Sequence, residues 1–157
     1  MKDEISIRKG VEGDLPELLA LVKELAAYER APLEVEVTIE EMRNWGFGQD
    51  KIFDFFVATH AQKIVGIALY YYKYSTWKGK CLFLEDIIVT EPYRRYGLGT
   101  KLFDEVVKVA RDKKVRRMEW QVLEWNEPAI HFYKKYEAVL DAEWINGKLT
   151  YDQLQSL

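Results

Sequence analysis

The chain has 157 residues, 48% of them hydrophobic and 14% aromatic, and a formal net charge of −3. This length predicts one domain, residues 1–157, with a hydrophobic core of its own, and the apolar content excludes a disordered protein. The negative charge argues against a nucleic-acid partner, and no apolar run predicts a membrane-spanning helix or a signal peptide. We therefore expect a cytoplasmic protein that binds neither nucleic acid nor membrane.

The cysteine and histidine content bears on disulfides and metals. Cys81 is the only cysteine, so no disulfide within the chain is expected. His60 and His131 are far apart in the sequence, and neither has a second ligand at metal-binding spacing. We expect no metal site.

Hydrophobic periodicity predicts strands and helices in alternation along the chain. A first strand is predicted over residues 4–8. Capping boxes at Asp14–Glu17 and Thr38–Glu41 predict the starts of two helices, of which the second ends near Gly46. The further predicted elements are strands over 53–59, 63–74, 80–89 and 115–123, helices over 98–113 and 126–136, and a final hairpin of two strands around Asn146-Gly147.

This order of elements predicts the fold class. Strands joined by tight turns pair antiparallel, whereas strands joined through helices can pair parallel. The prediction is an α/β sandwich with a mixed, mostly antiparallel central sheet of about seven strands, flanked by about four helices.

The segment Arg94-Arg95-Tyr96-Gly97-Leu98-Gly99-Thr100 lies between an apolar strand and a predicted helix. Its glycines allow a ligand to approach the backbone, and the free N–H groups of the first helical turn attract anions. The segment therefore predicts a cradle for a pyrophosphate. A dinucleotide fingerprint would need glycine in place of Leu102, and a P-loop would need Gly-Lys followed by Ser or Thr. A solvated glycine-rich turn is the alternative.

Two carboxylates, Glu85 and Asp86, interrupt the apolar strand before this loop. Such residues are costly in a strand unless they are exposed, paired or functional. Alternation along the strand predicts that they point to opposite faces, one into a cleft and one into a structural bond. A glutamate in a cleft attracts a cationic amine and accepts its proton, and burial raises its pKa toward a useful value. A salt bridge with Arg94 or Arg95 is the alternative.

A further aromatic candidate lies in Trp125–Tyr133. Pro128 suits the first turn of a helix that Asn126 begins. Tyr133 is predicted about a turn and a half along this helix, near its N-terminal end, where its phenol reaches a bound ligand. The alternative is that Tyr133 is a core aromatic residue.

These motifs resemble the GCN5-related N-acetyltransferase (GNAT) superfamily. Arg-x-x-Gly-x-Gly resembles its acetyl-CoA loop, Asn-x-x-Ala-x-x-Phe-Tyr resembles its second cofactor motif, and the order of elements is similar. The runs 70–80, 84–86, 93–99 and 124–128 resemble the diamine (spermidine/spermine) N-acetyltransferase subgroup. The resemblance extends from Ile7 to about Trp144.

The resemblance implies an N-acetyltransferase that moves an acetyl group from acetyl-CoA to a primary amine of a diamine or polyamine, such as spermidine or spermine, by direct attack. Glu85 would bind the amine and accept its proton, and Tyr133 would be the general acid that protonates the CoA thiolate. A homodimer is implied as well. The alternatives are an enzyme for thialysine or lysine-like amino acids, a protein or peptide N-acetyltransferase, and a CoA-binding module without catalysis.

The resemblance also implies two sets of binding residues. The cofactor set comprises Ile87, Ile88, Val89, Arg94, Arg95, Tyr96, Gly97, Leu98, Gly99, Thr100, Asn126, Glu127, Pro128, Ala129 and Tyr133. The substrate set comprises Tyr28, Glu29, Trp77, Glu85, Glu119, Trp120, Gln121, Glu143 and Trp144.

The chain departs from the family near its end. Glu137 stands where a glycine usually ends the last helix, and the chain is shorter after Ala138. Glu143 and Trp144 are therefore either amine contacts or surface residues of an edge strand. A lysine-like substrate carries a carboxylate and needs a cation in its pocket, whereas Glu29 and Glu85 favour a polyamine.

Overall fold

The computed structural model describes residues 4–157, which form two compact units, one up to Gln121 and one from Val122 to Leu157. The first unit contains β1 (Ile5–Lys9), α1 (Leu15–Tyr28), α2 (Ile39–Phe47), β2 (Asp54–His60), β3 (Lys63–Ser75), β4 (Gly79–Val89), α3 (Leu98–Asp112) and β5 (Met118–Trp120). The second contains α4 (Glu127–Lys134) and α5 (Tyr151–Ser156). The single domain predicted from the length stays a prediction.

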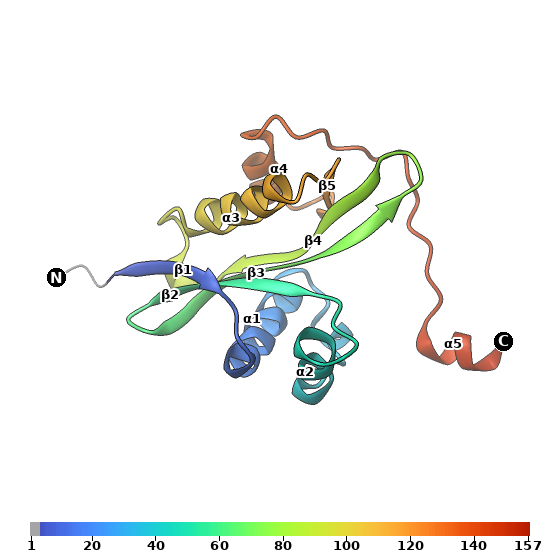
Figure 1. Ribbon diagram of the computed structural model, residues 1–157, viewed down its shortest axis with the longest axis horizontal. Coiled ribbons are helices and arrows are strands. Elements are labelled where there is room, and N and C mark those ends of the chain that lie inside the picture. Colours follow the sequence, from blue (N-terminus) through green and yellow to red (C-terminus); the bar gives the residue numbers. More distant parts are fainter. Residues whose placement is uncertain (1–3) are drawn as a thin grey trace. The chain divides into compact units, whose positions relative to one another are not determined.

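A mixed sheet is the centre of the first unit, in the order β1-β2-β3-β4-β5 (Figure 1). The strands β1 to β4 pair antiparallel with their neighbours in the chain. Strand β5 follows α3 and pairs parallel with β4, as expected for strands joined through a helix. Helices α1 and α2 cover one face, and α3 covers the other (Figure 1). The predicted α/β sandwich is confirmed.

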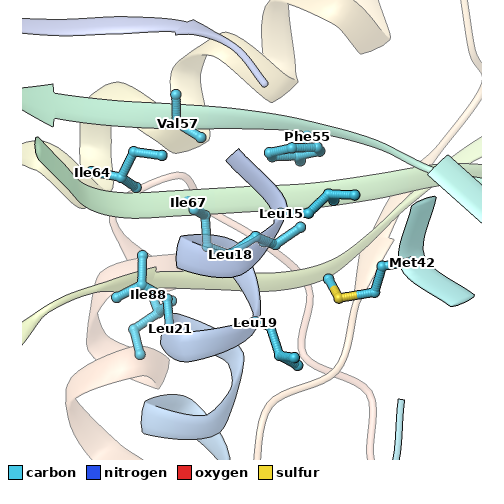
Figure 2. Packing of buried hydrophobic residues seen from close by; sticks show 10 residues of the cluster. All are labelled: Leu15, Leu18, Leu19, Leu21, Met42, Phe55, Val57, Ile64, Ile67 and Ile88. Carbon is cyan, nitrogen blue, oxygen red and sulfur yellow. The ribbon is translucent and has the colours of Figure 1, made fainter. Parts of the chain in front are cut away.

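The core on the α1 face depends on the leucine-rich side of that helix. Leu15 and Leu18 are 0% exposed. They pack against apolar side chains of three strands and of α2, as Figure 2 shows: Met42, Phe55, Val57, Ile64, Ile67 and Ile88. On the opposite face α3 buries Leu98, Leu102, Phe103, Val106 and Ala110. Burying each of these larger apolar side chains contributes about 1.5–3 kcal/mol, so both faces of β4 are held by packing.

Only one of the two predicted capping boxes forms. Thr38 Oγ1 accepts a hydrogen bond from the Glu41 N–H (3.1 Å), and the Thr38 N–H donates to Glu41 Oε1 (3.0 Å). Asp14 instead accepts from Arg8 Nη1 (2.7 Å) and from the Val11 N–H (2.8 Å). The Arg8 hydrogen bond lowers the pKa of Asp14. The prediction at Asp14–Glu17 is wrong because the Asp14 carboxylate is already bonded upstream of the helix.

The C-terminal strands differ from the prediction. The strand expected over 115–123 extends only from Met118 to Trp120, and residues 138–150 form neither helix nor strand, so the predicted hairpin is wrong. An isolated hairpin is marginally stable unless it packs on another element, and Ile145 is 96% exposed. Across residues 4–157 the sheet therefore has five strands, fewer than the seven expected.

The departure at Glu137 does not prevent the helix from ending. Helix α4 stops at Lys134, and Glu137 has a φ of 57°, the left-handed conformation that glycine usually adopts. Its N–H donates to the Lys134 carbonyl (3.0 Å). A non-glycine residue therefore fills the position at a conformational cost.

Candidate functional site

The turn before α3 has the geometry of an anion site. Arg95 and Gly97 have positive φ angles of 73° and 76°, and such alternation directs backbone N–H groups into one concavity. The Lys101 N–H donates to the Gly97 carbonyl (3.1 Å), so the three preceding N–H groups at the helix start have no acceptor within the helix. A Cβ added at Gly97 or Gly99 would meet no heavy atom of the described residues within 4 Å. The turn is open to a pyrophosphate.

Arg94 connects this turn to β4 and α1. Its Nε donates to the Val89 carbonyl (2.9 Å), and its guanidinium lies 5.4 Å from the centroid of the Tyr28 ring. In the described part of the chain no salt bridge joins Arg94 or Arg95 to Glu85. The salt bridge that the sequence offered as the alternative is therefore not formed.

Strand β4 has an open edge beyond its middle. It pairs with β3 along its whole length, but the described pairs with β5 extend only from Leu82 to Leu84. From Glu85 to Val89 the backbone groups on that side have no strand partner among the described residues. An open strand edge binds an extended polar chain through main-chain hydrogen bonds. The predicted contact of Ile87–Val89 with pantetheine would use this edge.

Glu85 is the extra residue of a β-bulge in β4. Leu69 of β3 lies opposite Asp86, whereas the next residue, Tyr70, lies opposite Leu84. Glu85 therefore has no opposite residue on β3. A bulge interrupts the alternation of side chains along the strand.

As a result, both carboxylates lie on the face that α1 covers. Leu69 packs against the α1 core, so Asp86 opposite it shares that face. Tyr71, two residues after Leu69 on β3, faces the same way, and its Oη donates to Glu85 Oε2 (2.9 Å). The prediction that the two carboxylates point to opposite faces is wrong because the bulge shifts the alternation.

Glu29, directly after α1, completes a cluster of three carboxylates. Burial, and after it the charges of Glu85 and Glu29, raise the pKa of Asp86 to about 7. Burial and then the charge of Glu85 raise the pKa of Glu29. Electrostatic coupling between like charges favours a bound cation, which relieves their repulsion.

The second unit contains the remaining cofactor candidates. Asn126 Oδ1 accepts from the Ala129 N–H (3.3 Å) and caps α4, with Pro128 in the first turn as predicted. Tyr133 is 5% exposed, and its ring meets that of Phe132 edge to face at 5.3 Å. It lies next to the last residue of this short helix. The expected position near the N-terminal end is therefore wrong, because α4 is shorter than predicted.

Comparison with known proteins tests the family resemblance inferred from the sequence. Residues 18–137 match the model of the Acetyltransferase (GNAT) family. The chain belongs to this family. The resemblance drawn from the glycine loop, the second cofactor motif and the order of elements is thus confirmed.

Individual relatives agree with the family. The thialysine N-epsilon-acetyltransferase of Bos taurus is 38% identical over 138 residues, which cover 83% of this chain and 81% of that protein. The spermidine/spermine N(1)-acetyltransferase-like protein 1 of Homo sapiens is 36% identical over 138 residues, 83% of this chain but 20% of that protein. A possible acetyltransferase from Clostridium difficile 630 shares the fold with a TM-score of 0.79, at 22% identity and covering 94% of this chain and 99% of that one.

As a GNAT enzyme the chain transfers an acetyl group to an amine, and the family takes that group from acetyl-CoA. The open turn before α3 and the open edge of β4 fit the two polar parts of such a donor, a pyrophosphate and an extended amide chain. Among residues 4–157 no three His, Cys, Asp or Glu side chains are grouped to hold a metal ion. No described helix has the length and apolarity to span a membrane.

The structure also shows where the residues predicted to bind the substrate lie. Tyr28 is the last residue of α1, and its ring lies beside Arg94. Glu29 follows it, and its carboxylate is electrostatically coupled to Glu85. Trp77 lies at the tip of the β3–β4 hairpin and is 76% exposed. The strand from Gly79 to Glu85 spans about 20 Å. Within a single copy of the chain, Trp77 is therefore too far from the carboxylates to lie beside them.

The β5 residues have structural partners. Glu119 Oε2 lies 3.4 Å from Lys73 Nζ and 3.3 Å from Arg117 Nε, so two cations balance its charge. The Trp120 ring meets Phe103 of α3 edge to face at 5.5 Å. Gln121 is the residue after β5. Their substrate roles stay predictions.

The other two candidates, Glu143 and Trp144, lie in the second unit, in the segment without helix or strand. The Glu143 N–H donates to Asp141 Oδ1 (2.8 Å), and Trp144 is 71% exposed. Neither belongs to an edge strand, contrary to that alternative. Their role as amine contacts stays a prediction.

Sequence reasoning misses two residues of the site, Asp86 and Tyr71. The sequence pattern assigns one of the two carboxylates to a structural bond and Tyr71 to an aromatic strand. Neither the bulge in β4 nor the contact between Tyr71 and Glu85 has a signal in a single sequence. Burial and the hydrogen bond to Glu85 raise the pKa of Tyr71, which keeps its hydroxyl protonated as a donor.

We expect Tyr71→Phe to lower kcat about tenfold with a smaller change in KM, because Glu85 loses the hydrogen bond that orients it. The Tyr71 ring stacks on Phe83 (5.4 Å), and phenylalanine preserves that packing. Steady-state kinetics and a thermal melt measure the effect. Tyr74→Phe on the same strand, at a side chain 76% exposed, is the control. Equal losses in the two variants would contradict a positioning role for Tyr71.

Proposed function

We propose that this enzyme acetylates a primary amine of a small cationic molecule by direct attack. Diamines and polyamines, such as spermidine or spermine, fit the acidic cluster, and so do thialysine and lysine-like amino acids. The observation that supports this proposal is the group Glu29, Glu85 and Asp86, gathered at a bulge where β4 gains an open edge. The names of the cattle and human relatives give support to both substrate classes.

The proposed mechanism assigns one proton transfer to each of two residues. The amine binds as an ammonium, attracted by the carboxylates, and must lose a proton before it attacks the acetyl carbonyl. Glu85 accepts that proton, directly or through water. Tyr133 donates a proton to the departing thiolate. The bulge and the Tyr71 hydrogen bond orient Glu85 for its part.

A thiol-release assay over a panel of amines tests this function. The panel contains diamines, polyamines, lysine, thialysine and a peptide with an exposed amine. We expect acetyl-CoA-dependent release with the small amines. Release with no diamine, polyamine or lysine analogue would contradict the proposal, and release with the peptide alone would favour a protein or peptide acetyltransferase.

The dependence of kcat/KM on pH should reflect the titration of Asp86. Its pKa of about 7 means that the carboxyl is protonated below that pH and charged above it. As the pH falls through about 7 the cluster loses one negative charge, so kcat/KM for a cationic amine should fall. We expect Asp86→Asn, which mimics the protonated form, to lack this inflection. An inflection that persists in the variant would assign the titration to another group.

The other expected properties are part of the proposal. We infer that acetyl-CoA is the only cosubstrate, that no metal takes part, and that the protein acts in the cytoplasm as a homodimer. Apolar side chains exposed on the second unit support self-association: Val139, Trp144, Ile145 and Leu149. Sedimentation velocity that gives a monomer at micromolar concentration would contradict the dimer.

A further inference from the structure

The segment Thr90–Arg94 connects the end of β4 to the anion turn before α3. The first residue after it, Arg95, has a φ of 73°, a left-handed conformation that has a cost for any residue other than glycine. A residue keeps such a conformation only where the surrounding contacts determine it. The geometry of the anion turn therefore depends on what anchors the residues just before it.

Helix α1 anchors the first residue of this segment. Thr90 Oγ1 donates a hydrogen bond to Glu24 Oε1 (2.9 Å). The Thr90 N–H donates to the Val65 carbonyl of β3 (2.9 Å), and the Thr90 carbonyl accepts from the Tyr93 N–H (2.9 Å). Thr90 is thus bonded to α1 and to the sheet, and it begins the 3-10 turn η3 (Glu91–Tyr93).

Strand β2 supplies a second anchor, at the other end of η3. His60 is the last residue of β2, and its Nδ1 lies 2.9 Å from Tyr93 Oη. The centroids of the two rings are 5.2 Å apart. Glu24 and His60 thus hold the two ends of η3, one through Thr90 and the other through Tyr93.

Glu24 has a feature that a purely structural bond does not need. Its Oε2 is buried and has no hydrogen-bond partner in the part of the chain that the structure describes. An unpaired buried carboxylate oxygen disfavours folding, and groups of this kind occur at functional sites. One helical turn further along α1, the Tyr28 ring lies 5.4 Å from the Arg94 guanidinium. The same side of α1 therefore contacts both ends of the segment Thr90–Arg94.

We propose that Glu24 and His60 are positioning residues for acetyl-CoA. Glu24 acts through Thr90 and His60 acts through Tyr93, and together they hold the turn so that its free N–H groups converge on the pyrophosphate. This inference rests on the proposed use of the turn before α3 for the pyrophosphate. It does not depend on which amine is acetylated.

Titration of the protein with CoA and with pantetheine, the part of CoA that lacks the pyrophosphate, tests this role. We expect Glu24→Ala to weaken CoA binding about tenfold, because Thr90 loses its acceptor, and to change pantetheine binding less than about twofold. Alanine is the best helix former, so α1 is preserved. Glu24→Gln keeps an oxygen that can accept from Thr90 and should restore CoA binding to within about twofold of the unmodified protein. Chemical shifts followed by NMR give both dissociation constants.

Two further variants remove the same contacts from the other side. Thr90→Val replaces the hydroxyl donor by a methyl group of similar shape, and it should give the same pair of results as Glu24→Ala. Tyr93→Phe removes only the oxygen that meets His60 and preserves the ring contact. It should weaken CoA binding about three- to tenfold and leave pantetheine binding unchanged.

Glu40→Ala is the control, because Glu40 is an exposed glutamate of α2. It should keep both affinities, and thermal melts show whether each variant is folded. Equal weakening of CoA and pantetheine would overturn the positioning role. Unchanged CoA affinity in Glu24→Ala or in Tyr93→Phe would overturn the role of Glu24 or of His60, respectively. These outcomes leave the acetyltransferase proposal standing, whereas failure of the unmodified protein to bind CoA would remove the proposed cofactor site.

Discussion

Replacing Glu85 by glutamine should lower kcat/KM for the amine about 100-fold, with the largest loss at low pH. Glutamine preserves the shape of the side chain and can still accept the Tyr71 hydrogen bond, but it carries no charge and cannot take a proton from the ammonium. At low pH the free amine is scarcest, so the reaction depends most on a base within the site. Initial rates from pH 6 to 9 measure the effect.

Glu40→Gln provides the matched control for this variant. Glu40 is an exposed glutamate in the first turn of α2, outside the cluster of three carboxylates. We expect it to keep the rate and the pH profile of the unmodified enzyme. If Glu85→Gln also kept them, Glu85 would be neither the base nor the amine-binding residue, and the bulge would have a purely structural role.

Replacing Tyr133 by phenylalanine should lower kcat by about 100-fold while CoA affinity is largely kept. The substitution removes one oxygen atom from a side chain that is 5% exposed and preserves its edge contact with Phe132. Without the phenol, the thiolate leaves unprotonated, which slows turnover but not binding. Stopped-time assays give kcat, and calorimetry with CoA gives the affinity.

Tyr136→Phe is the corresponding control in the second unit. The Tyr136 ring also contacts Phe132, at 5.6 Å, so the two variants make the same change beside the same neighbour. We expect Tyr136→Phe to turn over normally. Loss of CoA affinity in Tyr133→Phe, with kcat unchanged at saturation, would assign Tyr133 to cofactor binding instead of proton donation.

The parts of the fold that the sequence predicts well are those with local causes. Thr38 and Glu41 form the expected capping box because the bond closes within one helical turn. The glycine turn before α3 forms as expected because Gly97 supplies the positive φ that begins the helix. Both features depend on residues close together in the chain, so the local residue pattern is enough to predict them.

The errors arise where residues outside the predicted motif determine the outcome. The Asp14 capping box fails because Arg8 takes the carboxylate. The Asn146-Gly147 turn favours a hairpin locally, but the expected strands have no described sheet partners and do not form. A local turn preference therefore does not determine strand formation.

The candidate site shows the same division. Glu85 is identifiable from sequence because a carboxylate in an apolar strand is costly. The bulge that brings Asp86 to the same face depends on the register between β3 and β4, which no single sequence reveals.

Transfer of a labelled acetyl group tests the central claim most directly. The enzyme is incubated with isotopically labelled acetyl-CoA and the best amine of the panel, and the amine is analysed by mass spectrometry. We predict label on one nitrogen of the amine, formed only when enzyme and acetyl-CoA are both present and strongly reduced in Glu85→Gln. Tight binding of CoA with all the label left in acetyl-CoA would contradict the account and identify a CoA-binding module without catalysis.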